Sequence, residues 1–463
     1  MTPTTNSSAR TVTEPRAAKA NVPMFLNQRI RRIALFAVLF LAFLFRLWFG
    51  LCSQFQDSDA KQIYLLGLKF YATGAWPYFG PDVIWGEVQI PGALQALLVG
   101  TPFFVLPIPE APYILLNILS FASLCFLAWY CCKRLPELPA WFVWSWLLTA
   151  PWLLDLSTTI YNPSYVLTGS ILFFIGALEI FPLTSRNIIP TPAAYFMMGF
   201  AVCWVMQLHM SWVILVPYVG LALLFQVRNS SNRGRALVSG VAWFMLGALV
   251  TGSLLLPTYI RYGLSRGTGG TASTITFNPE NLTAGWGILI RSLSFASFEI
   301  PRLLGTHTAE RLAFLKQERW LSPLVVFLFA VGTTQVIVLL ISWFFRDHVQ
   351  KDWKAVKYLV LFNVCLTYLS FLFSIKPPQS NHLYVTLPIP MIYSLYCWSR
   401  ILNRVRWQRF AGVFIACGII FYIGLAVHRR PRISLYPERQ IIESAIANKD
   451  YKILGERRPN TLY

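Results

Sequence analysis

Long runs of apolar residues, each close to the length of a membrane-spanning helix, recur along most of this chain. A helix needs about 20 predominantly apolar residues to cross a bilayer. A further run, 92–107, is short and ends in proline, so we predict that it dips into the outer leaflet without crossing. We predict a spanning helix in each of eleven other runs: 33–54, 112–132, 138–154, 163–182, 192–208, 210–227, 236–257, 321–345, 357–375, 383–398 and 409–427.

The composition supports this interpretation of the pattern. Of the 463 residues, 56% are hydrophobic and only 13% are charged, whereas soluble proteins carry about 25% charged residues. The eight cysteines lie in or beside the apolar runs and form no CxxC pair, so we expect packing roles for them. These features indicate an all-α polytopic membrane protein and exclude a disordered chain.

The net charge of +20 is concentrated in short loops between the apolar runs. Basic residues in such loops mark the cytoplasmic side of a membrane protein, so we do not expect nucleic acid as a partner. The basic segment 29–32 precedes the first run and places the N-terminus in the cytoplasm. If 92–107 dips, fourteen basic residues in five later loops also lie inside, and Arg429, Arg430 and Arg432 are the exception on the outer side.

This topology divides the chain into three parts. Residues 1–32 form a polar cytoplasmic tail that we expect to be disordered, 33–427 form the transmembrane domain, and 428–463 form a short outer tail. Two long outer loops, 55–111 and 258–320, interrupt the transmembrane domain. We expect a juxtamembrane helix on the outer face in each loop, at 59–72 and at 284–298, the second of them amphipathic.

Two carboxylates, Asp57 and Asp59, stand directly after the first apolar run. Either side chain can act as a general base on a substrate hydroxyl, and the oxygens of both can bind a divalent cation such as Mg²⁺ or Mn²⁺. The alternative is that they cap the helix that follows, since Asp is favoured there. Glu87, in the same loop, is either another carboxylate of this site or a charge that complements a helix dipole.

Polar residues at the ends of other runs extend this candidate site. Asp155 ends the third run on the same side as Asp57, so the two carboxylates can meet. Asn162 opens the fourth run, either as a substrate ligand or as the cap of a helix that starts with proline. Arg46 lies inside the first run, where an ionisable side chain indicates function or a buried partner, unless it reaches out to the interface.

Histidines and cations on the outer side are candidates for binding a phosphate through charge-assisted hydrogen bonds. His209 lies at a break between two short runs and could bind an anionic or hydroxyl group, or be a hydrogen-bonded structural residue. The others are in the second long loop or before the run 383–398, where Lys and Tyr are also ordinary interfacial anchors. These candidates are Arg291, Arg302, His307, Lys376, His382 and Tyr384.

Taken in order, these residues resemble the GT-C superfamily of integral membrane glycosyltransferases, in particular its family-39-like and aminoarabinose-transferase-like bacterial members. The pattern covers roughly 33–260, with an echo at 376–390. The chain departs from the commonest form of the pattern by having DSD in place of an adjacent Asp-Glu, and IPG in place of a double proline. The matching elements are Arg46, Asp57 with Asp59, the Thr73-Gly74 turn, Pro91, the Lys133-Arg134 pair, NPS at 162–164, QLHMS at 207–211 and HLY at 382–384.

The resemblance implies a GT-C-like bundle and a sugar donor carried on a polyprenyl phosphate that enters from the membrane lipids. It also implies transfer with inversion to a lipid, glycan or protein acceptor on the outer side of a bacterial inner membrane. Asp57 would match the catalytic acidic residue of the family, with Asp59 as its helper or alternative. With or without a divalent metal, the leaving phosphate would be stabilised by cations drawn from Arg291, His307, Lys376 and His382.

Two other functions are compatible with these residues. A glycan ligase or polymerase of the O-antigen type depends on Arg and His in outer loops, as found in 258–320, and needs no acidic pair after the first span. A transporter or flippase would perform no chemistry. Carboxylates inside the spans, which ion-driven carriers often need, are scarce here, since Glu179 and Asp155 are the exceptions.

Overall fold

The computed structural model describes residues 28–53, 58–82, 89–161, 163–181, 187–264, 275–294, 300–305, 307–344, 352–374 and 380–454. The chain divides into two compact units, Met1–Ala42 and Phe43–Tyr463. Helix α1, Gln28–Leu51, runs through the boundary between them. The described part of the first unit is the helical segment 28–42, and every other element belongs to the second unit.

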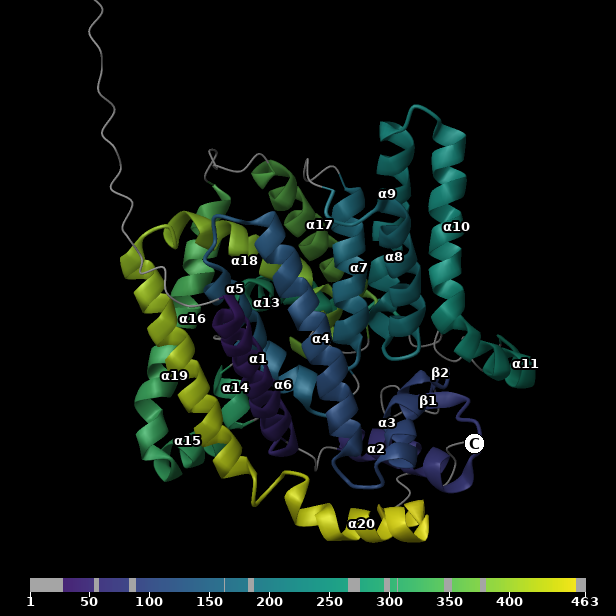
Figure 1. Ribbon diagram of the computed structural model, residues 1–463, viewed down its shortest axis with the longest axis vertical. Helices are drawn as coiled ribbons and strands as arrows, with labels where there is room; N and C mark the ends of the chain where they lie inside the picture. Colours follow the sequence, from purple (N-terminus) through teal and green to yellow (C-terminus); the bar gives the residue numbers. More distant parts are fainter. Residues whose placement is uncertain are drawn as a thin grey trace, which may run out of the picture. The chain divides into compact units, whose positions relative to one another are not determined.

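The described elements of the second unit are almost all helices (Figure 1). The two strands, β1 (Phe79–Asp82) and β2 (Gln89–Pro91), pair antiparallel with Phe79 opposite Pro91. The first group of helices is α2 (Ser58–Thr73), α3 (Leu94–Val105), α4 (Ala111–Arg134), α5 (Ala140–Thr149), α6 (Pro151–Thr158), α7 (Val166–Ile180), α8 (Thr191–Met206), α9 (Val216–Asn229), α10 (Arg233–Gly252) and α11 (Leu256–Leu264). The second group is α13 (Gly285–Ser294), α14 (Ile300–Leu304), α15 (Thr308–Gln317), α16 (Ser322–Trp343), α17 (Trp353–Leu372), α18 (Pro388–Ile401), α19 (Val405–Arg429) and α20 (Arg439–Asn448).

Short 3-10 helices connect several of these elements. They are η1 (Met210–Leu215), η2 (Ser253–Leu255), η4 (Pro279–Ala284), η5 (Arg319–Leu321), η6 (Ser380–Thr386), η7 (Tyr436–Glu438) and η8 (Tyr451–Leu454). Two of them matter for the site described below. Helix η1 leads into α9 after the break at His209, and η6 leads into α18.

Seven helices of the described chain are long and apolar enough to cross a membrane. They match seven of the eleven predicted runs, and the other four runs contain shorter helices. The prediction of an all-α polytopic membrane protein is therefore confirmed. The seven helices are Ile33–Leu51, Ala111–Arg134, Met210–Asn229, Arg233–Gly263, Arg319–Trp343, Trp353–Leu372 and Val405–Arg429.

The shorter helices show where the apolar pattern is interrupted. The run 138–154 is split into α5 and α6 at Pro151, because proline cannot donate the backbone hydrogen bond that would continue the helix. Helix α3 has 12 residues, so it extends about 18 Å and is too short to cross a bilayer of about 30 Å. Helix α18 is buried among other helices at every position from Pro388 to Cys397.

Two ends of the second unit can be distinguished along α4, which has 24 residues and is therefore about 36 Å long. The end where α4 begins also carries α2, α3, the β-hairpin and α20 (Figure 1). We call it the α2 end. The opposite end, where α4 finishes at Arg134, is called the Arg134 end. Asp59 is the second residue of α2, so its backbone belongs to the α2 end.

Candidate active site

A fully buried cation, Arg46, lies in the last two turns of α1. Its guanidinium donates to the carbonyl oxygen of Leu148 at 2.9 Å, to Ser157 Oγ at 2.6 Å and to Ser120 Oγ at 3.4 Å. These partners come from α5, α6 and α4, and all of them are neutral. The Nε atom has no hydrogen-bond partner among the described residues. The side chain is 0% exposed, so Arg46 points into the helical core and does not reach out to the interface.

The 3-10 helix η6 brings Tyr384 to the surroundings of Arg46. Tyr384 is buried and interacts electrostatically with both Arg46 and Asp155. Ser170 Oγ on α7 donates to the carbonyl oxygen of Val385 at 2.6 Å, which fixes η6 against α7. Helix η6 also contacts η1 and α13. Several elements that are distant in sequence therefore meet around η6.

Asp155 on α6 forms an ion pair with Arg429, the last residue of α19. Arg429 Nη1 lies 3.1 Å from Asp155 Oδ1, and Nη2 donates to the carbonyl oxygen of Leu303 at 2.7 Å. Arg429 is one of the three basic residues that the charge count placed on the unexpected side. The carboxylate of Asp155 explains why Arg429 lies at this end of α19, since a paired charge can be buried at lower cost.

His209 precedes η1 and caps it. Its Nδ1 atom accepts a hydrogen bond from the Ser211 backbone N at 3.2 Å and lies 2.7 Å from Ser211 Oγ. Burial lowers the pKa of His209 to about 4, so the imidazole is neutral at neutral pH. A neutral ring of this kind suits a hydroxyl partner better than it suits an anion.

The residues just before His209 contact the first long loop. Gln207 Nε2 donates to the carbonyl oxygen of Thr251 at 2.8 Å, which holds the break after α8 against α10. Gly92, after strand β2, packs directly on Gln207, because a Cβ added at Gly92 would lie 2.5 Å from Gln207 Cγ. The φ angle of Gly92 is +115°, a conformation that favours glycine. The hairpin of the loop 55–111 thus lies beside the QLHMS segment.

Arg291 is carried by α13, the helix expected at 284–298. The described helix begins at Gly285 and places Ile288 and Leu293 in the core, while Trp286 is exposed. Helix α13 packs against α16, α17, α18 and η6. Arg291 is half-buried, and the helix that carries it is one of the elements that contact η6.

His307 lies elsewhere, at the start of α15. Its backbone N donates to Glu310 Oε2 at 3.2 Å, as in a capping box, and its side chain is exposed. Helix α15 packs on α14 and η5. Arg302 belongs to α14 and is exposed. His307 therefore has a role at the start of α15. Neither His307 nor Arg302 belongs to η6 or α13.

Several candidates lie outside the described residues. Asp59 and His382 belong to described helices, α2 and η6, but their side chains are outside the description. The end of α1 lies next to α6, because a Cβ at Gly50 would lie 2.4 Å from the carbonyl oxygen of Thr158. The candidates that are not described at all are Asp57, Glu87, Asn162 and Lys376.

The described side chains contain no group of three His, Cys, Asp or Glu that could hold a metal ion. The carboxylates proposed as metal ligands, Asp57 and Asp59, are not among those side chains. A divalent cation thus stays an expectation from the sequence, and we assign no step to it.

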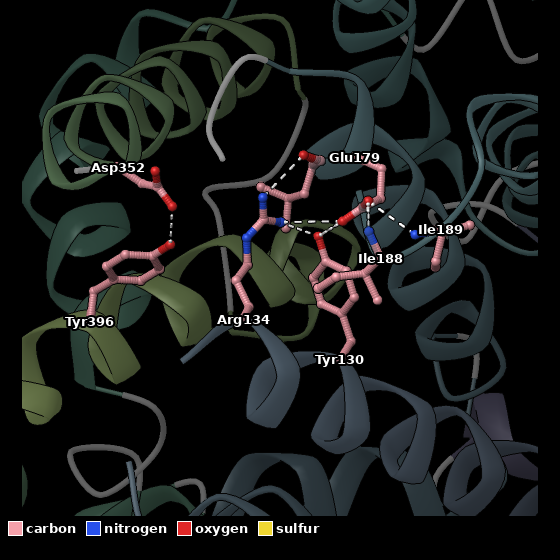
Figure 2. Close-up of polar contacts among 8 residues, drawn as sticks. Tyr130, Arg134, Glu179, Ile188, Ile189, Asp352 and Tyr396 are labelled. Carbon is pink, nitrogen blue, oxygen red and sulfur yellow. Dashed lines mark hydrogen bonds and ion pairs between the residues drawn. The ribbon is translucent and has the colours of Figure 1, made fainter. Parts of the chain in front are cut away.

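The Arg134 end holds a separate buried ion pair (Figure 2). Glu179 Oε1 lies 3.8 Å from Arg134 Nη1 and accepts a hydrogen bond from the Tyr130 hydroxyl at 2.7 Å, while Arg134 also donates to that hydroxyl. Glu179 Oε2 accepts from the backbone N of Ile188 at 2.8 Å and of Ile189 at 3.1 Å. Both oxygens of the carboxylate are therefore occupied by contacts that join α4, α7 and the segment before α8.

This cluster shows which residues the sequence pattern missed. Arg134 belongs to a basic pair that the sequence pattern predicts in a short loop exposed to solvent on the cytoplasmic side, yet it is buried in an ion pair. Nearby, Tyr396 Oη on α18 donates to Asp352 Oδ2 at 3.2 Å (Figure 2). Asp352 directly precedes α17, so this hydrogen bond brings α18 and the start of α17 into the same region. The partners of Arg46, Ser120 and Ser157, were also missed. A single serine in an apolar run carries no signal that an arginine on another helix needs it.

No protein-family model matches the chain, and neither does any curated protein. Among solved structures, its fold is similar to the crystal structure of ArnT from Cupriavidus metallidurans bound to undecaprenyl phosphate. The TM-score is 0.50 at 12% sequence identity, and the match covers 92% of this chain and 77% of that chain. At this identity the likeness shows the fold alone, a bundle of membrane helices similar to that of ArnT.

Proposed function

We propose that the chain is a membrane glycosyltransferase that moves a sugar from a polyprenyl-phosphate donor to an acceptor hydroxyl. The observation that carries the proposal is the GT-C-like fold, shared with a protein whose crystal structure holds undecaprenyl phosphate. The ordered pattern of Arg46, the carboxylates after α1 and the QLHMS and HLY segments supports it. The acceptor is a lipid, a glycan or a protein.

The proposed reaction is a single displacement with inversion. The carboxylate of Asp57 takes the proton of the acceptor hydroxyl, and the acceptor oxygen forms a bond to the anomeric carbon of the sugar. The bond between that carbon and the phosphate oxygen breaks, and polyprenyl phosphate leaves with the electron pair. Asp59 supports this step or replaces Asp57 in it, and the proton then passes from the carboxylic acid to water.

The leaving phosphate is proposed to bind around η6. Arg46 is a buried cation whose hydrogen-bond partners among the described residues are neutral, so an anion nearby would offset the cost of its burial. Tyr384 and His382 are part of η6, and Arg291 lies on a helix that contacts η6. Charge that develops on the phosphate would be stabilised by these donors.

The proposed location is a bacterial inner membrane with the N-terminus in the cytoplasm. The basic loops between spans support this orientation. It places the α2 end on the periplasmic side, where the acceptor would arrive, and the Glu179–Arg134 pair on the cytoplasmic side.

The proposal is tested with purified full-length protein in detergent and a panel of polyprenyl-phosphate sugars. We expect free polyprenyl phosphate to be released from one donor class, slowly with water and faster with the true acceptor. A folded protein that releases no polyprenyl phosphate from any donor, with or without candidate acceptors, would contradict it.

An O-antigen-type ligase is the competing function, because such a ligase would depend on Arg291, and Arg291 lies on α13, a helix that contacts η6. The ligase would depend on Arg291, whereas the proposed glycosyltransferase would depend on Asp57 or Asp59. Loss of product formation in Arg291→Gln, with Asp57→Asn and Asp59→Asn fully active, would favour the ligase. Substrate recovered unmodified on the far side of vesicles would instead favour a transporter.

A further inference from the structure

Helix α11, Leu256–Leu264, turns away from the axis of the spanning helix α10 at the α2 end of the molecule (Figure 1). Helix α10 has 20 residues and is therefore about 30 Å long, which matches the hydrocarbon thickness of a bilayer. The 3-10 helix η2 connects the two helices, as such short stretches often do. Helix α11 therefore begins where the apolar core of the membrane ends.

One face of α11 is apolar and exposed. Leu256 and Ile260 lie one turn apart on the same face, and they are 56% and 83% exposed. On α10, Leu249 is 60% exposed, as expected for a spanning helix that faces lipid. Leu249 precedes Leu256 by about two turns of helix, so the exposed face of α11 continues the lipid-facing side of α10.

The other face of α11 holds the start of the β-hairpin. Thr258 Oγ1 donates to the carbonyl oxygen of Tyr78 at 2.6 Å, and Arg261 Nη1 donates to Tyr78 Oη at 2.9 Å. The guanidinium of Arg261 also lies 4.8 Å from the centre of the Tyr78 ring, within the range of a cation–π contact. The ring of Tyr262 lies 5.3 Å from that of Tyr78 and 5.1 Å from that of Phe79. Tyr78 is thus bound to α11 through its backbone, its hydroxyl and its ring.

The hairpin connects α11 to the break before η1. The carbonyl oxygen of Tyr78 also accepts a hydrogen bond from the backbone N of Gly92 at 2.9 Å, and Gly92 packs directly on Gln207. A Cβ added at Gly80, on strand β1, would lie 3.8 Å from the carbonyl oxygen of Gln207. A displacement of α11 would therefore be transmitted through Tyr78 to the QLHMS segment.

We propose that α11 is an interfacial helix: its Leu256–Ile260 face inserts between the acyl chains and headgroups of the bilayer, and its other face anchors the hairpin there through Tyr78. Interfacial helices bury their apolar face about 5–10 Å into this boundary. Tyrosine is enriched at the same depth, and an arginine such as Arg261 can keep its charged group in water above it. The occupant of the face is membrane lipid, because the face continues the lipid-facing side of α10. This inference goes beyond the proposed function and does not depend on it.

The first test is photo-crosslinking of the full-length protein in vesicles of phosphatidylethanolamine and phosphatidylglycerol. The photoreactive residue p-benzoylphenylalanine replaces Ile260, and the mass of the irradiated protein identifies what it contacts. Leu249 on α10 is the lipid-facing control position, and Glu443, exposed on α20, is the polar one. We expect lipid adducts at 260 and 249. A crosslink from 260 to a second copy or to another segment of the chain, or no lipid adduct at 260 when 249 gives one, would overturn the proposal.

The second test asks whether the membrane contact of α11 holds the hairpin. A charged side chain is costly at membrane depth, so Ile260→Asp should drive this face out of the bilayer, whereas Ile260→Leu keeps it apolar. In the same vesicles, amide hydrogen exchange at residues 78–82 should become at least about tenfold faster in Ile260→Asp and stay at the wild-type rate in Ile260→Leu. Unchanged exchange in Ile260→Asp would overturn the anchoring of the hairpin. Neither measurement requires the protein to transfer sugar, so a failure of the proposed function leaves both results decisive.

Discussion

At the scale of single residues, the buried charged side chains of the described chain differ in how they are paired. Glu179 has a partner for each oxygen, and Arg429 is paired with Asp155. Arg46 is more deeply buried than Arg429, yet it has neutral hydrogen-bond partners and an Nε atom without one among the described residues. Buried groups left in this state are rare and need an explanation, and a bound anionic substrate group would provide one.

The hydroxyl of Ser157 should matter to stability because it holds Arg46. Replacing Ser157 by alanine leaves one guanidinium N–H buried without its 2.6 Å partner, which we expect to cost about 1–3 kcal/mol of unfolding free energy. The measurement is thermal unfolding of the purified protein in detergent. Ser145→Ala is the control, since the Ser145 hydroxyl bonds, among the described residues, to the backbone of its own helix. Equal melting temperatures for the two variants would contradict this role of Ser157.

At the scale of elements, close contact between helices decides the geometry around the break at His209. Helices α8 and α10 approach so closely that a Cβ at Gly247 would lie 2.0 Å from the carbonyl oxygen of Phe196, and one at Gly199 would lie 1.9 Å from that of Phe244. Small residues allow membrane helices to pack at such distances. The pair α8–α10 is thereby fixed, and with it the position of Gln207.

Gly247→Ala should separate α8 from α10. We expect a loss of about 1–3 kcal/mol, as for other overpacked interiors, measured as a lower melting temperature in detergent. Gly220→Ala is the matched control, because a Cβ there meets nothing within 4 Å. That control should be neutral or stabilising by up to about 1 kcal/mol, since alanine favours a helix. A neutral Gly247→Ala would show that the two helices are not packed so closely.

The junction of η5 with α19 should depend on pH. Glu318 Oε1 lies 2.9 Å from His428 Nδ1, and the hydrogen bond from His428 lowers the pKa of Glu318 below its usual 4.5. A depressed pKa means that the stabilisation is present above about pH 4.5 and is lost as the pH falls through the lower, folded-state value. The melting temperature of Glu318→Gln should thus lie below wild type at pH 6 and converge with it in more acidic buffer. A difference in melting temperature that stays the same in acidic buffer would contradict a stabilising role for ionised Glu318.

At the scale of the whole molecule, the sequence predicts the spans well and the contacts between them poorly. Run length identifies α4, α16 and α19, and Pro151 explains why the run 138–154 breaks. The burial of α18 cannot be predicted, because a helix that is apolar all round suits lipid and protein surroundings equally. The Asp155–Arg429 pair joins residues 274 positions apart, beyond any local pattern. The one sign of this pair in the sequence is that Arg429 lies on the side where basic residues are not expected.

For the candidate site, too, the sequence predicts individual residues well and the contacts between elements poorly. The sequence identifies Arg46 because an ionisable side chain is costly inside a spanning helix. It identifies His209 and Tyr384 by their places at the ends of apolar runs. It cannot show that η6 joins their surroundings, since that arrangement depends on the packing of α7, α13 and η1. The Lys61–Glu438 ion pair is equally hidden, because it joins residues 377 positions apart.

The most direct test of this account is the rate of polyprenyl-phosphate release by Asp57→Asn, measured with the donor that the wild-type protein uses. Glu280→Gln, which removes an exposed carboxylate from the second long loop, is the control. We expect Asp57→Asn to lose at least about 100-fold in kcat, as when a general base is removed, with an unchanged melting temperature and a fully active control. Wild-type turnover in Asp57→Asn would contradict the assignment of the base and the mechanism built on it.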